Sequence, residues 1–267
     1  MQSSTTDNSD HGVVVQEEGE SSNANANAGT HVPPLSLNDS NENESLDDLA
    51  GGGVLPPLAG GNPNKKTLVL DLDGTLVDTV CTDSPAGYDF CINLEKPFYV
   101  FKRPGVDELL QHLGSTGLYE IVIFTAGTKP YADAVVDKLL DSLPPNEHNN
   151  VTNRNIIPPT HRLARDYCSK IEGVLDEVKD LSILGRNLKN VIFVDDRPTS
   201  FYLHRQNGIA IDCWTADDTE NKSLFSLLDF CLLIEDPKLP YSTTKDVRQL
   251  IRQFFSKKPP TQTPENS

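Results

Sequence analysis

Three short apolar runs, each ending beside a polar residue, restrict the possible folds of this chain more than any other feature. They are Thr67–Leu72 (TLVLDL), Tyr119–Phe124 (YEIVIF) and Val191–Val194 (VIFV), with the length and composition of buried strands. Alternation of such strands with helical patterns predicts an α/β fold with a mainly parallel central sheet flanked by helices. Because ligands bind beyond the carboxyl ends of parallel strands, we expect Asp71, Thr125 and Asp195 to meet at one edge of the sheet.

The intervals between these runs contain apolar residues at helical spacing. One helix is expected to open at Pro104 and to stop at Gly114, because glycine commonly ends a helix. The other expected elements are helices at Pro130–Leu143, Lys179–Leu184, Leu224–Ile234 and Asp246–Phe255, and a weaker strand at Gly208–Ile211.

Charge and composition separate the two ends of the chain from its middle. The chain has 267 residues and a net charge of −16, and residues 1–64 hold ten of its 39 acids and none of its 23 Lys and Arg. Such a Ser-, Asn-, Gly- and Pro-rich segment buries too little apolar area to fold, so we expect residues 1–64 to be a disordered acidic tail. Its "VPPLSL" and "GGVLPPLAGG" patches are either short docking motifs or plain spacer. Residues 65–256 are the expected folded domain, followed by a disordered tail at 257–267.

Several classes of protein are disfavoured by composition. No basic stripe stands out that would meet nucleic-acid phosphates, and no apolar run approaches the roughly 20 residues that span a bilayer. The start of the chain does not resemble a secretory signal. The five cysteines are scattered and form no CxxC pair, which favours reduced thiols in a nuclear or cytoplasmic protein. We therefore expect neither direct nucleic-acid binding nor a membrane anchor.

The segment LVLDLDGTLVDT carries the clearest chemical signal. Asp71 and Asp73 follow an apolar strand two residues apart and would share one face if the strand continued, while Gly74 lets the chain turn and Thr75 ties the loop. Two carboxylates offer hard oxygen ligands, and Mg²⁺ is commonly bound by one or two carboxylates together with a substrate phosphate. One carboxylate can attack phosphorus while the other moves the proton. A turn with two solvated acids is the alternative for this segment taken alone.

Together with three later segments, this motif resembles the haloacid-dehalogenase superfamily of aspartate-nucleophile phosphotransferases, whose first motif is DxDx[TV]. The resemblance implies that Asp71 is the nucleophile and Asp73 the acid/base. Thr125 in "YEIVIFTAG" resembles the second motif, a hydroxyl for a phosphate oxygen, and Lys179 in "VKDLSILGR" resembles the third. The acids of "NVIFVDDRP" resemble the metal-holding fourth motif. The metal ligands implied are Asp71, the main-chain carbonyl of Asp73, and one or both of Asp195 and Asp196.

A finer resemblance over about residues 66–235 is to the small C-terminal-domain phosphatases. It is carried by "FKRPGVDELLQHLG", "FTAGTKPYADAVVDKLL", "VKDLSILGR" and "VDDRPTSFYLHRQNGIAI". It implies a Rossmann-like fold with a small β insertion. It also implies a Mg²⁺-dependent phosphoserine/phosphothreonine phosphatase, with the RNA polymerase II tail as one candidate substrate. The intervals from Asp71 to Thr125 and from Thr125 to Lys179 are 54 residues each, which leaves no room for a large cap domain.

Substrate contacts are expected from the phosphate site and from the insertion. Thr75, Thr125 and Lys179 are placed at the phosphate, and Tyr88 and Phe90 either select the peptide or simply pack the insertion on the domain. His161, Arg162 and Arg165 either contact an acidic peptide or form a solvated loop face.

Two departures keep other functions open. The first motif reads DGT where many of these phosphatases have DET, and the fourth reads Asp195-Asp196 where several have Asp-Asn. The alternatives are a small-molecule phosphomonoesterase of the same superfamily and a non-catalytic module like the mitochondrial import subunit of this group. The resemblance favours the nucleus slightly over the cytoplasm, and the oligomeric state is unknown.

Overall fold

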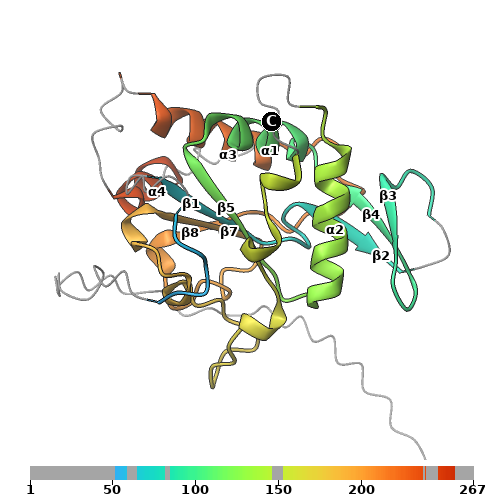
Figure 1. The fold of residues 1–267 in the computed structure, drawn as a ribbon, viewed down its shortest axis with the longest axis horizontal. Coiled ribbons are helices and arrows are strands. Elements are labelled where there is room, and N and C mark those ends of the chain that lie inside the picture. Colours follow the sequence, from blue (N-terminus) through green and yellow to red (C-terminus); the bar gives the residue numbers. More distant parts are fainter. Residues whose placement is uncertain are drawn as a thin grey trace, which may run out of the picture. The chain divides into compact units, whose positions relative to one another are not determined.

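The computed structural model describes residues 52–58, 65–81, 85–145, 153–236, 238 and 246–255, and Figure 1 shows their arrangement. The expected tail at 257–267 and most of the one at 1–64 lie outside these residues. Within them, no helix is long and apolar enough to cross a membrane.

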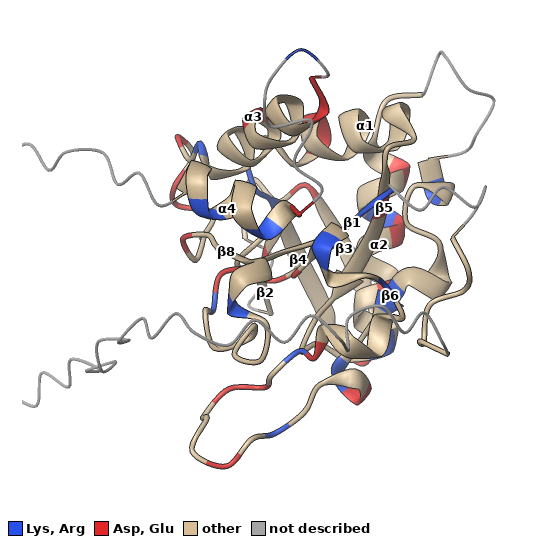
Figure 2. Ribbon diagram, turned by 90° about the vertical axis from the view of Figure 1, so that its left-hand side faces the viewer, with Lys and Arg blue, Asp and Glu red and all other residues tan. Residues whose placement is uncertain are grey.

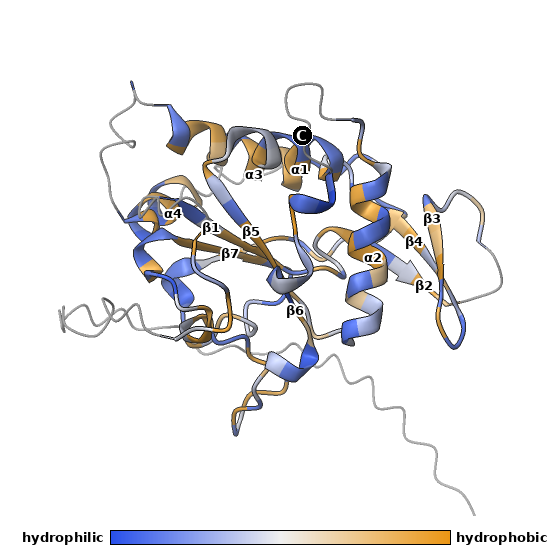
Figure 3. Cartoon of the chain, viewed as in Figure 1, coloured by the Kyte–Doolittle hydropathy of each residue, from blue (hydrophilic) through white to orange (hydrophobic). Residues whose placement is uncertain are grey.

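A five-stranded sheet forms the centre of the domain, in the order β6-β5-β1-β7-β8. Every neighbouring pair in it is parallel, as the sequence predicts. The strands are β1 (Lys66–Leu70), β5 (Tyr119–Phe124), β6 (Arg162–Leu163), β7 (Val191–Asp195) and β8 (Gly208–Ala210). β1, β5 and β7 are coloured hydrophobic over most of their length in Figure 3, as expected of strands buried on both faces.

The two faces of this sheet are covered differently. Alternate residues of the central strands, Leu68 and Leu70 among them, share one apolar core with the described α-helices. These helices are α1 (Val106–Thr116), α2 (Lys129–Ser142), α3 (Ser223–Glu235) and α4 (Val247–Phe255). The residues between, such as Val69, form a second core with Leu55 and with two leucines of η5 (Leu181–Leu184), a single 3₁₀ turn. In the described part of the chain the second face therefore has no α-helical layer.

Several predicted boundaries differ from the observed ones, three of them at positions that matter for the site or the packing. Helix α1 runs through Gly114 and ends at Thr116, and the following Gly117 has a φ of 67°, the left-handed conformation typical of a helix C-cap. Gly114 lies so close to Ile156 that a Cβ would come within 2.7 Å of its side chain, so packing accounts for this glycine. Strand β1 ends at Leu70. In place of the helix predicted at Lys179–Leu184, the structure has the 3₁₀ turn η5, which begins at Leu181 because the Asp180 side chain caps it, so Lys179 lies before the turn.

The β insertion is a separate three-stranded antiparallel sheet, in the order β2-β4-β3. Its strands are β2 (Val77–Val80), β3 (Phe90–Asn93) and β4 (Pro97–Lys102). This sheet confirms the predicted insertion. Between β5 and η5 lie helix α2, strand β6 and three short 3₁₀ turns, η2 (Asn153–Asn155), η3 (Pro159–His161) and η4 (Arg165–Tyr167). The loop after η4, yellow in Figure 1, projects from the domain with Asp and Glu along it in Figure 2.

Residues 52–58 differ from the disordered tail expected for 1–64. Leu55 is buried in the second core, and the backbone N–H of Val54 donates to the carbonyl of Ile183 over 2.8 Å. A short apolar motif inside a polar segment thus packs on the second face of the sheet, the face that carries Val69.

Candidate active site

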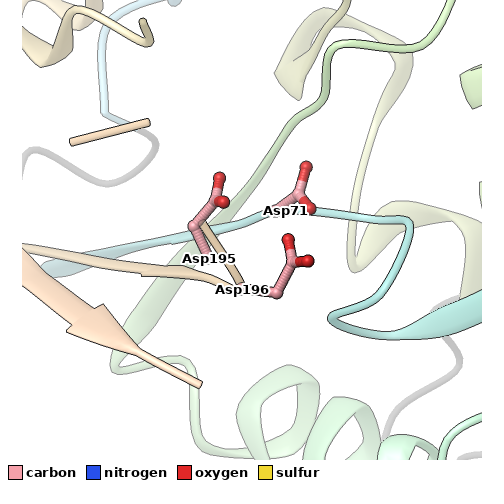
Figure 4. A group of neighbouring side chains, drawn as sticks. All are labelled: Asp71, Asp195 and Asp196. Carbon is pink, nitrogen blue, oxygen red and sulfur yellow. The ribbon is translucent and has the colours of Figure 1, made fainter. Parts of the chain in front are cut away.

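Three adjacent strands bring the expected acids together. Asp71 follows β1, Thr125 follows β5 and Asp195 ends β7, and these strands are neighbours in the sheet. Carboxylate oxygens of Asp71, Asp195 and Asp196 lie within 4.8 Å of one another, and Figure 4 shows the three side chains gathered at the strand ends.

This group fits a hard divalent cation. The Oδ1 atom of Asp196 is buried without a hydrogen-bond partner, which leaves a lone pair directed to no protein donor. The three carboxylates and the amine of Lys179 sum to a charge of −2, which Mg²⁺ would neutralise. Asp71, Asp195 and Asp196 are thus the side chains that would hold the metal. The side chain of Asp73 lies outside this group, in keeping with the expectation that only its main-chain carbonyl binds the metal.

Lys179 connects the nucleophile candidate to the fourth motif. Its Nζ lies 2.6 Å from Asp71 Oδ1 and 2.6 Å from Asp195 Oδ2, and the side chain is fully buried. Burial alone would lower the pKa of Lys179, but the two carboxylates outweigh it, so the pKa lies above its ordinary value. The amine is therefore a fixed positive charge beside the oxygen that would attack phosphorus.

The loop after Asp71 is held from several sides. The Thr75 hydroxyl donates to Asp71 Oδ2 at 3.4 Å and accepts from the backbone N–H of Asp196 at 3.2 Å, so it bridges the first and fourth motifs. Arg103, buried at the end of the β insertion, donates from Nη1 to the carbonyls of Gly74 and Thr75 at 3.1 and 3.2 Å. Gly74 has a φ of 78°, and a Cβ there would lie 2.8 Å from Asp196 Oδ2. Glycine therefore fits this turn for two reasons: it tolerates the positive φ, and it has no Cβ that would collide with Asp196.

Strand β1 ends before both Asp71 and Asp73, so their placement does not follow from ideal strand geometry. The Asp73 carboxylate accepts a hydrogen bond from the hydroxyl of Tyr131 on α2, and that hydroxyl also lies 2.8 Å from Thr79 Oγ1. Burial raises the pKa of Asp73 to about 6, although the Tyr131 hydrogen bond opposes the rise. A carboxyl that titrates near neutrality can give a proton in one step and take one in the next.

Thr125 stands at the same edge of the sheet, almost fully buried. Its Oγ1 accepts from the backbone N–H of Gly127 at 2.9 Å, and its own N–H donates to Leu163. The hydroxyl is thereby oriented within the tight turn that leads into α2. Its proposed role in holding a phosphate oxygen stays a prediction.

A cavity of about 360 Å³ opens beside Asp73. Its walls come from the β insertion and the start of α2, and its lining residues are Asp73, Thr79, Cys81, Leu94, Phe98, Gly127, Thr128, Tyr131 and Arg165. Tyr88 and Phe90 are not among these residues. Tyr88 is 39% exposed and contacts Tyr99 of the insertion, with ring centroids 5.0 Å apart and tilted ring planes, whereas Phe90 packs against the main core. The role of both residues in peptide selection stays a prediction.

The basic residues His161, Arg162 and Arg165, between Thr125 and Lys179, separate into two groups. Arg165 lines the cavity, whereas His161 and Arg162 are occupied elsewhere, His161 with Glu120 and Arg162 with the Ile157 carbonyl and Asp137. Tyr131 and Arg103 are two residues of the site that no sequence motif predicts. Both lie inside the family blocks, in "KPYAD" and "FKRPG", but their contacts depend on the tertiary fold.

An acid-rich strand edge of a parallel α/β domain, with a buried lysine between two of the carboxylates, defines a candidate phosphoryl-transfer site. Residues 66–240 match the family described as NLI interacting factor-like phosphatase, and the chain belongs to this family. The family is that of the small C-terminal-domain phosphatases of the haloacid-dehalogenase superfamily, as the motifs predict. Its members generally use a metal.

Curated relatives carry phosphatase names. The chain is 36% identical over 203 residues to "Phosphatase PSR1" of Saccharomyces cerevisiae, covering 74% of this chain and 42% of the relative. It is 39% identical over 194 residues to a "Probable C-terminal domain small phosphatase" of Dictyostelium discoideum, covering 70% and 57%. It is 37% identical over 182 residues to the human "CTD small phosphatase-like protein", covering 66% and 59%. The chain thus spans about half the length of the relatives that it matches.

Solved structures similar to this chain include that of Fcp1, described as an essential RNA polymerase II CTD phosphatase. The match has 20% sequence identity and a TM-score of 0.44, and it covers 72% of this chain and 62% of that one. A fission yeast Fcp1 variant bound to beryllium fluoride matches at 18% identity with a TM-score of 0.42, over 72% and 62% of the two chains.

Proposed function

We propose that this chain is a Mg²⁺-dependent protein phosphatase for phosphoserine and phosphothreonine, working through an aspartyl-phosphate on Asp71. The observation that carries the proposal is the buried amine of Lys179, 2.6 Å from both Asp71 and Asp195, beside a third carboxylate with an unpartnered oxygen. Membership of a phosphatase family and the phosphatase names of the relatives support it. Mg²⁺ would supply charge neutralisation of the phosphate and hold it in line with Asp71.

The residues divide the first half of the reaction between them. An oxygen of Asp71 attacks phosphorus, and the bond from phosphorus to the serine or threonine oxygen breaks. The carboxyl of Asp73 gives its proton to that leaving oxygen, and the pKa near 6 makes the protonated form accessible at neutral pH. Lys179 offsets the charge on the transferring group, and Thr125 would orient one of its oxygens.

The second half returns the site to its starting state. Asp73, now a carboxylate, accepts a proton from water as the water oxygen attacks phosphorus, and the bond from phosphorus to Asp71 breaks. Inorganic phosphate leaves, and Asp71 is again an ionised carboxylate beside Lys179. Thr75 keeps the Asp71 side chain oriented through both steps.

The substrate class follows from the relatives and from the access to the site. The cavity beside Asp73 is walled partly by the β insertion, so a segment of another protein can enter between the insertion and α2. The RNA polymerase II tail is one candidate substrate by resemblance. A nuclear or cytoplasmic location is part of the same proposal.

The test is phosphate release from a library of phosphoserine, phosphothreonine and phosphotyrosine peptides with Mg²⁺, with Asp71→Asn measured alongside. We expect release from the phosphoserine or phosphothreonine peptides and none from the variant. Hydrolysis of sugar phosphates or phosphoglycolate without peptide turnover would instead establish the small-molecule alternative, to which the Gly74 of the first motif points. No turnover of any phosphomonoester by the folded protein would favour a non-catalytic interaction module.

A further inference from the structure

Residues 52–58, which we name the strap, pack on the domain although they lie outside the family match at 66–240 and contain no catalytic motif (blue in Figure 1). Neighbouring side chains of the strap point in different directions, one into the domain and one into solvent. Leu55 is only 5% exposed, among Val69, Leu181 and Leu184, whereas its neighbour Val54 is 43% exposed. The strap thus contributes to the core of the domain through one side chain.

The strap also makes contacts that depend on its backbone. The Val54 N–H donates to the Ile183 carbonyl at 2.8 Å, and Arg186 Nη2 donates to the Pro56 carbonyl at 2.6 Å. Gly53 lies so close to Gly185 that a Cβ on Gly53 would be 2.2 Å from the Gly185 nitrogen. Its partners are therefore residues 183 to 186, the end of the turn that follows Lys179.

This turn follows Lys179 in the chain, with only Asp180 between them. The turn is a single 3₁₀ turn, Leu181–Leu184, on the sheet face that has no α-helix in the described part of the chain. The Lys179 N–H donates to Ser200, and Asp180 pairs with His204 and caps the turn, so the near end is held by the segment after β7. The far end is held by the strap and by Arg186, which also donates to both carboxylate oxygens of Glu120. A short turn has little stiffness of its own, so its position depends on all of these attachments.

We propose that the strap is a positioning element of the catalytic site, which holds the turn 181–184 so that Lys179 reaches both Asp71 and Asp195. The proposal rests on the function proposed above. It adds that turnover requires residues outside the family-matched region. Anything that lifts the strap from the domain then lowers the turnover rate without touching a catalytic residue.

The test compares full-length variants of the strap. Leu55→Ala removes the buried side chain, and Gly53→Ala adds a Cβ that collides with Gly185. Val54→Ala removes a similar volume from the exposed side and is the matched control. For each folded variant, two quantities are measured: kcat and KM with Mg²⁺ and an aryl phosphate, and the rate of Lys179 acetylation by mass spectrometry. Lys102, far from the strap contacts, is the internal reference because global unfolding would expose both lysines.

We expect Leu55→Ala and Gly53→Ala to lower kcat by roughly 10- to 100-fold with little change in KM, since small misplacements of a catalytic group have effects of this size. Acetylation of Lys179 relative to Lys102 should rise by about tenfold through local opening, and Val54→Ala should behave as wild type. If Leu55→Ala does not fold, Leu55→Val gives the same comparison, and Leu55→Met should restore activity.

Wild-type kcat and wild-type Lys179 acetylation in folded Leu55→Ala and Gly53→Ala would overturn the proposal, and so would an equal loss in Val54→Ala. Absence of turnover in the wild-type chain would refute the proposed function instead. The acetylation ratio then decides alone whether the strap positions Lys179: a rise supports it and an unchanged ratio refutes it.

Discussion

Replacement of Glu120 by glutamine tests the charge network at the other end of the sheet. Glu120 is 7% exposed at the start of β5. Its carboxylate accepts from Arg186 at 2.7 Å through each oxygen, from His161 at 2.9 Å and from Thr67 at 2.9 Å. Burial alone would raise the pKa of Glu120, but the hydrogen bonds from Arg186 and His161 outweigh it and set the pKa at about 2.

The magnitude follows from the difference between the folded and ordinary pKa values of Glu120. A fall from 4.5 to about 2 corresponds to about 3 kcal/mol of folding free energy, at about 1.4 kcal/mol per unit. Because the folded pKa is depressed, this stabilisation is fully present above pH ~4.5 and is lost as the pH falls towards ~2. Glu120→Gln has no such group, so it should be less stable than wild type by about 3 kcal/mol at neutral pH.

Urea unfolding at several pH values gives the measurement. The stability gap between wild type and Glu120→Gln should narrow by about 2 kcal/mol between pH 6 and pH 3, because over this range Glu120 takes up a proton in the unfolded wild-type chain but stays largely ionised in the folded protein. Glu108→Gln, on the exposed side of α1, is the charge-matched control, and its gap should stay within about 0.5 kcal/mol. A Glu120→Gln gap that is constant over this range would refute the reasoning.

Five further outcomes are expected. Asp71→Asn should abolish turnover while the melting temperature by circular dichroism stays near wild type, since the amide cannot attack phosphorus; turnover retained by the variant would exclude Asp71 as nucleophile. Beryllium fluoride should inhibit the wild-type protein by imitating the aspartyl-phosphate, which a steady-state assay checks. Excess EDTA should stop turnover and Mg²⁺ should restore it, and activity unchanged by EDTA contradicts the metal assignment. Tyr131→Phe removes a hydrogen bond to a carboxylate worth about 1.5–3 kcal/mol and should lower kcat/KM by roughly 10- to 100-fold; an unaffected kcat/KM would show that Asp73 needs no such partner. Alanine at both Tyr88 and Phe90 should leave peptide kcat/KM near wild type, because neither lines the cavity beside Asp73.

The central sheet could be predicted because its signals are local. Short apolar runs at Tyr119–Phe124 and Val191–Val194 mark the buried strands, and the observed β5 and β7 match them within one residue. The order of helices and strands implies parallel pairing, and parallel pairing places the strand ends at one edge. The meeting of Asp71, Thr125 and Asp195 therefore follows from patterns within a few residues of each.

Other features of the site and of the strap depend on partners far away in the chain, and no local sequence pattern predicts them. Tyr131 reaches Asp73 across 58 residues, and Arg186 reaches Pro56 across 130. A polar segment with a single buried leucine has the composition of a tail. Composition does not show that one face of the sheet, among the described residues, is covered by no α-helix and takes up Leu55. Strand and helix patterns reflect the backbone and its immediate neighbours. The partners of buried polar groups and the filling of a core depend on which distant segments the complete fold brings into contact.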